Sequence, residues 1–123
     1  MKALLIARES PVRSRLAEMI SELPDIQLEV TDLRVEAELI LPEFDPDVIL
    51  IDIDQTQGQG LEVIRQFRQG GSESSPVIMA LAGSGSLHYR ANCLAAGAMY
   101  FFNLERELEW LLDSLASIQE QLR

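Results

Sequence analysis

A short run of apolar residues that ends in two carboxylates constrains the fold of this chain more than any other stretch. The run extends from Val48 to Ile51, is mostly β-branched and follows Pro46. A continuous apolar run of this length is typical of a strand buried on both faces, as in the middle of a parallel sheet. Asp52 then lies where the strand emerges, and Asp54 lies in the loop beyond it.

Strand-like and helix-like segments alternate along the rest of the chain. Ser10 and Pro11 suit a helix start, because serine caps the first turn and proline fits its first position. Ile26–Val30 alternates apolar and polar residues, as expected of a half-exposed edge strand. The remaining strands are expected at Lys2–Ala7, Pro76–Ala82 and Met99–Phe102.

Helical periodicity is expected in each connection and after the last strand. Because helix-length segments join the strands, the chain is predicted to be an α/β protein of five (βα) units. Its doubly wound parallel sheet would have flavodoxin-like topology and the strand order 2-1-3-4-5. The helices are expected to carry the stripes Val12/Leu16/Met19/Ile20/Leu23, Val35–Leu41, Leu61/Ile64/Phe67, Leu87/Ala91/Leu94/Ala95 and Leu108/Leu111/Leu115/Ile118/Leu122.

Length and composition narrow the class of protein. The 123 residues are interpreted as one domain, 1–123. The net charge of −10 argues against direct contact with nucleic acid, because phosphate backbones require a basic face. No apolar run approaches the ~20 residues of a membrane span, so no membrane contact is expected. The single cysteine, Cys93, cannot form an internal disulfide, which fits a cytoplasmic protein.

The position of Asp52 makes it a candidate functional residue. In open α/β sheets, chemistry gathers at the carboxyl ends of the strands. Glu9 follows the first strand, so Glu9, Asp52 and Asp54 could meet at one edge, where oxygen ligands suit Mg²⁺. The simpler interpretation is that Asp52 ends the strand and binds a loop amide.

Four motifs in the correct order resemble the receiver domain of two-component response regulators. Asp47 to Asp52, followed by Gly60 to Val63, matches the family's "DVILLD…DGLEV" segment. Pro76 to Met79 resembles the start of its fourth strand. Ala96-Gly97-Ala98 followed by Tyr100 to Phe102 resembles its "AGA…YL" signature. The resemblance covers almost the full length of the chain.

The resemblance implies that Asp52 accepts a phosphoryl group from a histidine of a partner. Mg²⁺ would bring the two anions together, held partly by acids after the first strand. A hydroxyl ending strand 4 and a lysine after strand 5 would bind the phosphoryl oxygens. The module would be at most a self-phosphorylating acceptor and not an enzyme. The implied partners are a histidine kinase, a phosphotransfer protein or an output protein.

The chain departs from the family's pattern at most of these positions. Arg8 and Glu9 stand where the family has two adjacent acids. Without a hydroxyl after strand 4, the relay from the phosphoacceptor to the strand-5 aromatic should be absent. Leu81 or Ala82 stands at the family's hydroxyl position, Leu104 (or Asn103) at its lysine position and Thr56 at its loop-proline position. Phe101 keeps the aromatic residue of strand 5.

Arg8 suggests that the pocket is degenerate. A guanidinium beside Asp52 would take the electrostatic role of the metal, so we predict an Arg8–Asp52 ion pair and no cofactor. The domain would then be a pseudo-receiver that acts by protein–protein interaction. In the simplest interpretation Arg8 points to solvent and packs its stem on the surface. The alternative function is a conventional receiver phosphorylated at Asp52, with Glu9 and Asp52 as the Mg²⁺ ligands.

A flavodoxin-like cofactor protein would share this topology. Flavin phosphate binding would favour a loop rich in Ser, Thr and Gly after the first strand, and residues 8–11 do not provide one.

Several aromatic and charged side chains are candidates for a protein interface or for exposure to solvent. Trp110 lies roughly 120° from the apolar stripe of the last helix, so it is a candidate interface anchor. In the receiver-domain family that the chain resembles, helix 4, strand 5 and helix 5 carry the dimerisation and output contacts. The candidates on that face, including those for a homodimer, are Tyr89, Tyr100 and Trp110, whereas His88, Glu105 and Glu107 are expected to be solvated.

Overall fold

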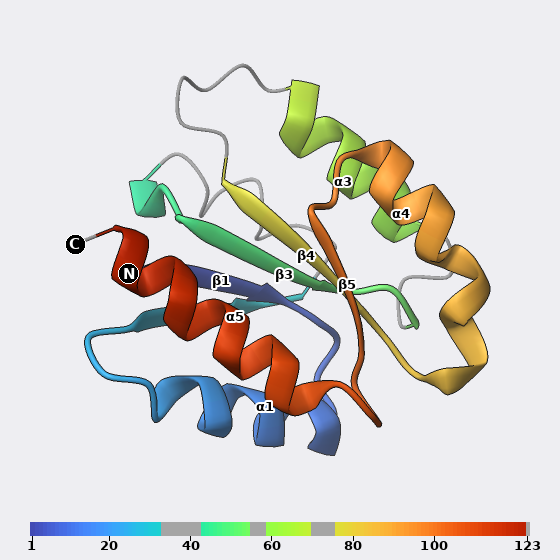
Figure 1. Cartoon of the computed structure of the whole chain (residues 1–123). Helices are drawn as coiled ribbons and strands as arrows, with labels where there is room; N and C mark the ends of the chain where they lie inside the picture. Colours follow the sequence, from blue (N-terminus) through green and yellow to red (C-terminus); the bar gives the residue numbers. More distant parts are fainter. Residues whose placement is uncertain (33–42, 55–58, 70–75, 123) are drawn as a thin grey trace.

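The protein folds around a parallel five-stranded sheet (Figure 1). The computed structural model describes residues 1–32, 43–54, 59–69 and 76–122. The strand order is β2-β1-β3-β4-β5, which confirms the predicted topology. The strands are β1 (Lys2–Ile6), β2 (Gln27–Thr31), β3 (Val48–Asp52), β4 (Val77–Ala82) and β5 (Tyr100–Asn103).

Helices cover both faces of the sheet. Helices α1 and α5 lie on one face and α3 and α4 on the other (Figure 1). The predicted helix at Val35–Leu41 lies outside the described residues. Among the described helices, none is long and apolar enough to cross a membrane. The helical elements are α1 (Pro11–Ser21), α3 (Gln59–Gln69), the 3₁₀ helix η2 (Ser84–Tyr89), α4 (Arg90–Ala96) and α5 (Leu108–Gln121).

Strand β3 is buried on both faces, as its sequence predicts. Ile49 and Ile51 pack in the cluster beneath α3 and α4, whereas Val48 and Leu50 pack in the cluster beneath α1 and α5. All four are 0% exposed. Alternate side chains of one strand therefore hold the two layers together, and each fully buried aliphatic side chain stabilises the fold by about 1.5–3 kcal/mol. By contrast, β2 alternates between exposed and partly buried residues, as expected of an edge strand.

The N-terminus of α1 forms as predicted. The backbone N–H of Arg13 donates to the Ser10 hydroxyl oxygen at 3.1 Å, and Pro11 occupies the first turn. Within the predicted stripe Leu16 and Ile20 are buried, whereas Val12, in the first turn of α1, is 53% exposed.

The end of α5 also differs from its predicted stripe. Leu111 and Leu115 are buried, whereas Leu122 follows the last helical residue and is 55% exposed. Gln119 is buried instead, and its side-chain amide donates to the Pro24 carbonyl, which ties α5 to the turn between α1 and β2. A polar side chain that satisfies a distant carbonyl gives no periodic signal in the sequence.

The prediction of the apolar face of the fourth helix is wrong. Leu87, Ala91, Leu94 and Ala95 are exposed, and Cys93 is the buried residue of α4. Leu87 lies in η2, which contains a non-helical Ser86, and α4 begins only at Arg90. Within α4 the buried side is marked by Cys93, with Ala96 partly buried, so Ala91, Leu94 and Ala95 lie on the exposed side. Burial raises the pKa of the Cys93 thiol.

We predict that Gly97→Ala destabilises the protein by about 2 kcal/mol or more. Gly97 ends α4 at φ 126°, and an added Cβ would collide with Cγ of Arg68, whose Nε donates to the Gly97 carbonyl at 2.8 Å. Urea unfolding measures the change. The matched control is Gly85→Ala, where a Cβ meets nothing within 4 Å and a change of no more than about 0.5 kcal/mol is expected. Equal losses in both variants would contradict the prediction.

Candidate functional site

Asp52 lies at the carboxyl edge of the sheet, where its sequence position predicts it. It is the last residue of β3, pairs in register with Leu81 of β4 and is 6% exposed. Its Oδ1 accepts a hydrogen bond from the backbone N–H of Asp54 at 3.0 Å. Burial and a defined acceptor geometry give this carboxylate a fixed position at the mouth of the central strand.

The predicted ion pair between Arg8 and Asp52 is not formed in this structure. Within the described ranges, the one ion pair joins Arg65 and Glu62 of α3. Arg8 and Glu9 are exposed, two and three residues beyond the end of β1 at Ile6. This arrangement matches the simpler interpretation, in which the Arg8 side chain lies at the surface.

A different guanidinium reaches the end of β1. Nη1 of Arg13 donates to the carbonyl oxygen of Ala7 at 3.1 Å. The Ser10 cap places the first turn of α1 directly after β1, and Arg13 lies three residues further on. Sequence reasoning missed this contact, although the position of the cap was a usable signal.

The carboxylates Glu9, Asp52 and Asp54 do not converge on a metal site. All three are described, and no group of three His, Cys, Asp or Glu residues in the described part of the chain has metal-binding geometry. Instead, Oδ2 of Asp54 accepts from the backbone N–H of Gly83 at 2.6 Å. Asp54 therefore joins the loop after β3 to the loop after β4.

The two candidate hydroxyl positions in β4 carry buried apolar side chains. Leu81 and Ala82 are both 0% exposed. A hydroxyl follows them at Ser84, the first residue of η2. Its Oγ donates to Oε2 of Glu105 at 2.6 Å and accepts from Nδ2 of Asn103 at 3.3 Å.

The candidate lysine position is also apolar. Leu104 is partly buried against the cluster beneath α1 and α5, and its N–H donates to the Ala82 carbonyl at 2.8 Å. The preceding Asn103 is 4% exposed, and its Oδ1 accepts from the N–H of Glu105 at 2.9 Å. The N–H of Asn103 donates to Oε1 of Glu107 at 2.9 Å. Glu105 and Glu107, expected to be solvated, therefore both accept internal hydrogen bonds.

These bonds form one chain of contacts along the carboxyl ends of β3, β4 and β5, which we call the edge network. It joins three loops that are far apart in the sequence through hydrogen bonds of 3.3 Å or less, and the peptide bond between Gly83 and Ser84 completes it. Its members, in spatial order, are Asp52, Asp54, Gly83, Ser84, Glu105, Asn103 and Glu107.

A groove lies beside the edge network. Trp110 is 62% exposed and Leu87 is 46% exposed, whereas Phe101 is 7% exposed. Neither of the two other interface candidates lines it: Tyr100 stacks on Phe102 with ring centroids 5.7 Å apart, and Tyr89 contacts the exposed ring of His88. The groove has a volume of about 410 Å³ and is lined by Leu87, Arg90, Phe101, Asn103, Arg106, Glu107 and Trp110.

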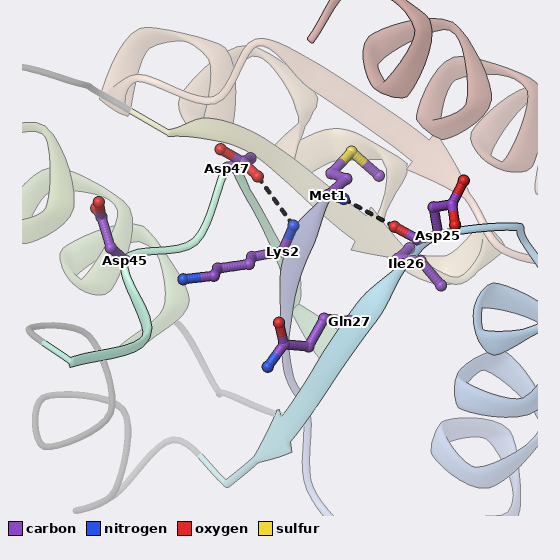
Figure 2. Close-up of a pocket in the computed structure, with 7 residues that line it drawn as sticks. All are labelled: Met1, Lys2, Asp25, Ile26, Gln27, Asp45 and Asp47. Atoms are coloured by element: carbon purple, nitrogen blue, oxygen red, sulfur yellow. Dashed lines mark hydrogen bonds between the residues drawn. The ribbon is translucent and has the colours of Figure 1, made fainter. Parts of the chain in front are cut away.

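A second hollow lies at the opposite edge of the sheet, where β1, β2 and β3 begin (Figure 2). Here the Met1 ammonium donates to the Asp25 carbonyl at 2.8 Å, and the Lys2 N–H donates to Oδ2 of Asp47 at 2.9 Å. The length of β3 separates this hollow from Asp52, so it takes no part in the candidate site. Its lining residues are Met1, Lys2, Asp25, Ile26, Gln27, Asp45 and Asp47.

Solved structures of response regulators share this fold. The signal receiver domain of a DNA-binding response regulator from Colwellia psychrerythraea 34H has a TM-score of 0.80 at 16% identity, over 98% of each chain. The signal receiver domain from Bermanella marisrubri has a TM-score of 0.80 at 21% identity, over 94% of this chain and 95% of that one. A LuxR-family DNA-binding response regulator from Staphylococcus aureus has a TM-score of 0.76 at 18% identity, over 96% of this chain and 98% of that one.

The sequence itself matches one family. None of the curated proteins matches it. The model of the response regulator receiver domain matches residues 4–115, which is most of the chain and extends from within β1 into α5. The chain belongs to the response regulator receiver domain family.

Proposed function

We propose that this receiver domain is a signalling module with a degenerate phosphoacceptor pocket, which acts by protein–protein interaction without Mg²⁺-dependent phosphorylation. The edge network is the observation that carries the proposal. The donors beside Asp52, the Gly83 N–H and the Ser84 hydroxyl, already bind carboxylates of the chain itself. Leu81 or Ala82 stands at the family's hydroxyl position and Leu104 (or Asn103) at its lysine position, so neither group is provided.

Electrostatics supports the same proposal. Attack by a carboxylate on an anionic phosphoryl group requires cations that offset the repulsion. The Leu104 side chain is partly buried and neutral, Arg8 is exposed, and Glu105 adds a negative charge beside the loop after β4. In the part of the chain that the structure describes, no group of three His, Cys, Asp or Glu residues is placed to hold a metal ion, which supports a pocket that works without Mg²⁺.

The alternative function is a conventional receiver that is phosphorylated at Asp52 by a histidine kinase. Its support is family membership together with the buried carboxylate at the end of β3. Glu9 and Asp52 would then be the acids available to a metal ion. Under either function the domain is a signalling module of the cytoplasm and not an enzyme.

The proposed docking surface is the groove beside the edge network. Leu87 and Trp110 supply exposed apolar area, which a protein partner would bury. Arg90 and Arg106 flank it, and in the described part of the chain neither forms an ion pair. A histidine kinase, a phosphotransfer protein or an output protein with carboxylates around an apolar anchor would complement these charges.

A homodimer is the second candidate for this surface. The groove is lined by both Arg106 and Glu107, and a surface with both signs of charge can pair with its own copy about a two-fold axis.

The net charge of −10 opposes direct contact with DNA, although the Staphylococcus aureus and Colwellia psychrerythraea relatives are described as DNA-binding proteins.

We predict that acetyl phosphate with Mg²⁺ adds no phosphoryl group to Asp52, because the cations and donors for the transfer are missing or occupied. Intact-protein mass spectrometry measures the modification, with Asp52→Asn as the blank. The double variant Arg8→Asp/Leu104→Lys, which supplies a second acid and a cation, is expected to gain a modification that Asp52→Asn abolishes. An Asp52-dependent mass increase in the wild-type protein would establish the alternative function.

For the homodimer we predict that Trp110→Ala weakens self-association by about tenfold or more, because an exposed tryptophan at an interface is a common hot spot. Sedimentation equilibrium measures the dissociation constant. Leu122→Ala is the matched control, since Leu122 is 55% exposed but lies beyond the other end of α5. If both variants dimerise as the wild type does, the groove is not the dimer interface. A monomeric wild type would exclude the homodimer.

A further inference from the structure

The loop after β4 is held from both sides by carboxylates. From the side of β3, Oδ2 of Asp54 accepts from the Gly83 N–H at 2.6 Å. From the side of β5, Oε2 of Glu105 accepts from the Ser84 hydroxyl at 2.6 Å. Hydrogen bonds to ionised acceptors are shorter than those between neutral groups, and both of these contacts measure 2.6 Å.

The two carboxylates converge on Gly83. A Cβ at this residue would lie 2.9 Å from Oδ2 of Asp54 and 3.4 Å from Oε1 of Glu105. Two carboxylates that approach the same point repel each other, so a donor for each is needed to keep them there. The Gly83 N–H and the Ser84 hydroxyl provide these donors, and the absence of a side chain at Gly83 provides the space.

The same contacts reach the docking groove. The donors begin the segment that forms η2, and η2 carries Leu87, which lines the groove. Asn103 binds both Ser84 and the backbone of Glu105, and it lines the groove together with Glu107. A movement of the Gly83–Ser84 segment would therefore change the position of Leu87 relative to Trp110.

We propose that Asp54 and Glu105 form an internal latch that sets the shape of the Leu87–Trp110 groove in place of an external anionic group. The inference rests on the proposed function and names the regulation of that site. Asp54 binds Asp52 through its backbone N–H and Gly83 through its carboxylate, so a phosphoryl oxygen on Asp52 would have to displace Asp54 to reach the Gly83 N–H. The latched groove is thus available to a partner without phosphorylation.

The test compares Asp54→Ala and Glu105→Ala with Glu18→Ala by heteronuclear NMR of the whole chain. Glu18 is exposed on α1 and does not line the groove, so its replacement removes the same charge without a latch contact. Asp54→Ala is expected to speed hydrogen exchange of the Gly83 amide by about tenfold or more, because its acceptor is lost. Both latch variants are expected to shift the Leu87 amide and the Trp110 indole signals, and Glu18→Ala to shift neither.

Ser84→Ala provides a second route to the same readout without a change of charge. It removes the hydroxyl that binds Glu105, so it is expected to reproduce the Leu87 and Trp110 shifts of Glu105→Ala. Combining Ser84→Ala with Glu105→Ala should then add little to either alone. Far-UV circular dichroism confirms that each variant is folded.

The latch is overturned if Gly83 exchange in Asp54→Ala stays within about twofold of the wild-type rate, or if the Leu87 and Trp110 signals remain unchanged in folded Glu105→Ala and Ser84→Ala. None of these measurements involves phosphate. An Asp52 that accepts a phosphoryl group would therefore refute the proposed function alone, whereas unchanged latch variants with an unmodified Asp52 would refute the latch alone.

Discussion

Burial of β3 on both faces is the constraint on which the structure depends. Its side chains alternate between the two apolar clusters, and the strand pairs with β1 on one side and β4 on the other. A shift of one residue in the pairing of β3 with its neighbours would exchange the two faces of the strand and turn Asp52 to the other face of the sheet. The register of β3 is therefore strongly specified. The same packing that stabilises the sheet therefore delivers one carboxylate, nearly buried, to the carboxyl edge where receiver domains carry their phosphoacceptor.

At that edge the chain satisfies its polar groups internally. Asn103 and Asp52 are nearly buried, and buried polar groups are costly unless they are hydrogen-bonded. The loops after β3, β4 and β5 meet this requirement by binding one another through Asp54, Ser84 and Glu105. Acidic side chains, which would repel an incoming phosphoryl group, thereby become the acceptors that order the edge. This physical difference separates the proposed module from a phosphorylation switch built on the same fold.

The sequence predicted the strand order, the Ser10 cap and the place of Asp52, because each depends on local periodicity or local capping chemistry. The buried side of α4 could not be predicted, because the helix is only seven residues long and its apolar residues Ala91, Leu94 and Ala95 are exposed, whereas Cys93 is buried. The contacts of Asp54 with Gly83 and of Ser84 with Glu105 span 29 and 21 residues, and charged loop residues carry no pattern that identifies distant partners. The sequence places Arg8 near Asp52 at the strand ends but does not specify the direction of the Arg8 side chain, so it cannot establish an ion pair.

We propose that the edge beside Asp52 is held by the chain's own side chains and does not respond to phosphoryl chemistry. Heteronuclear NMR spectra recorded before and after addition of Mg²⁺ and beryllofluoride test this proposal. We expect the amide signals of Gly83 and Ser84 and the indole signal of Trp110 to keep their positions. Saturable shifts of these signals that disappear in Asp52→Asn would contradict the claim and identify a conventional receiver.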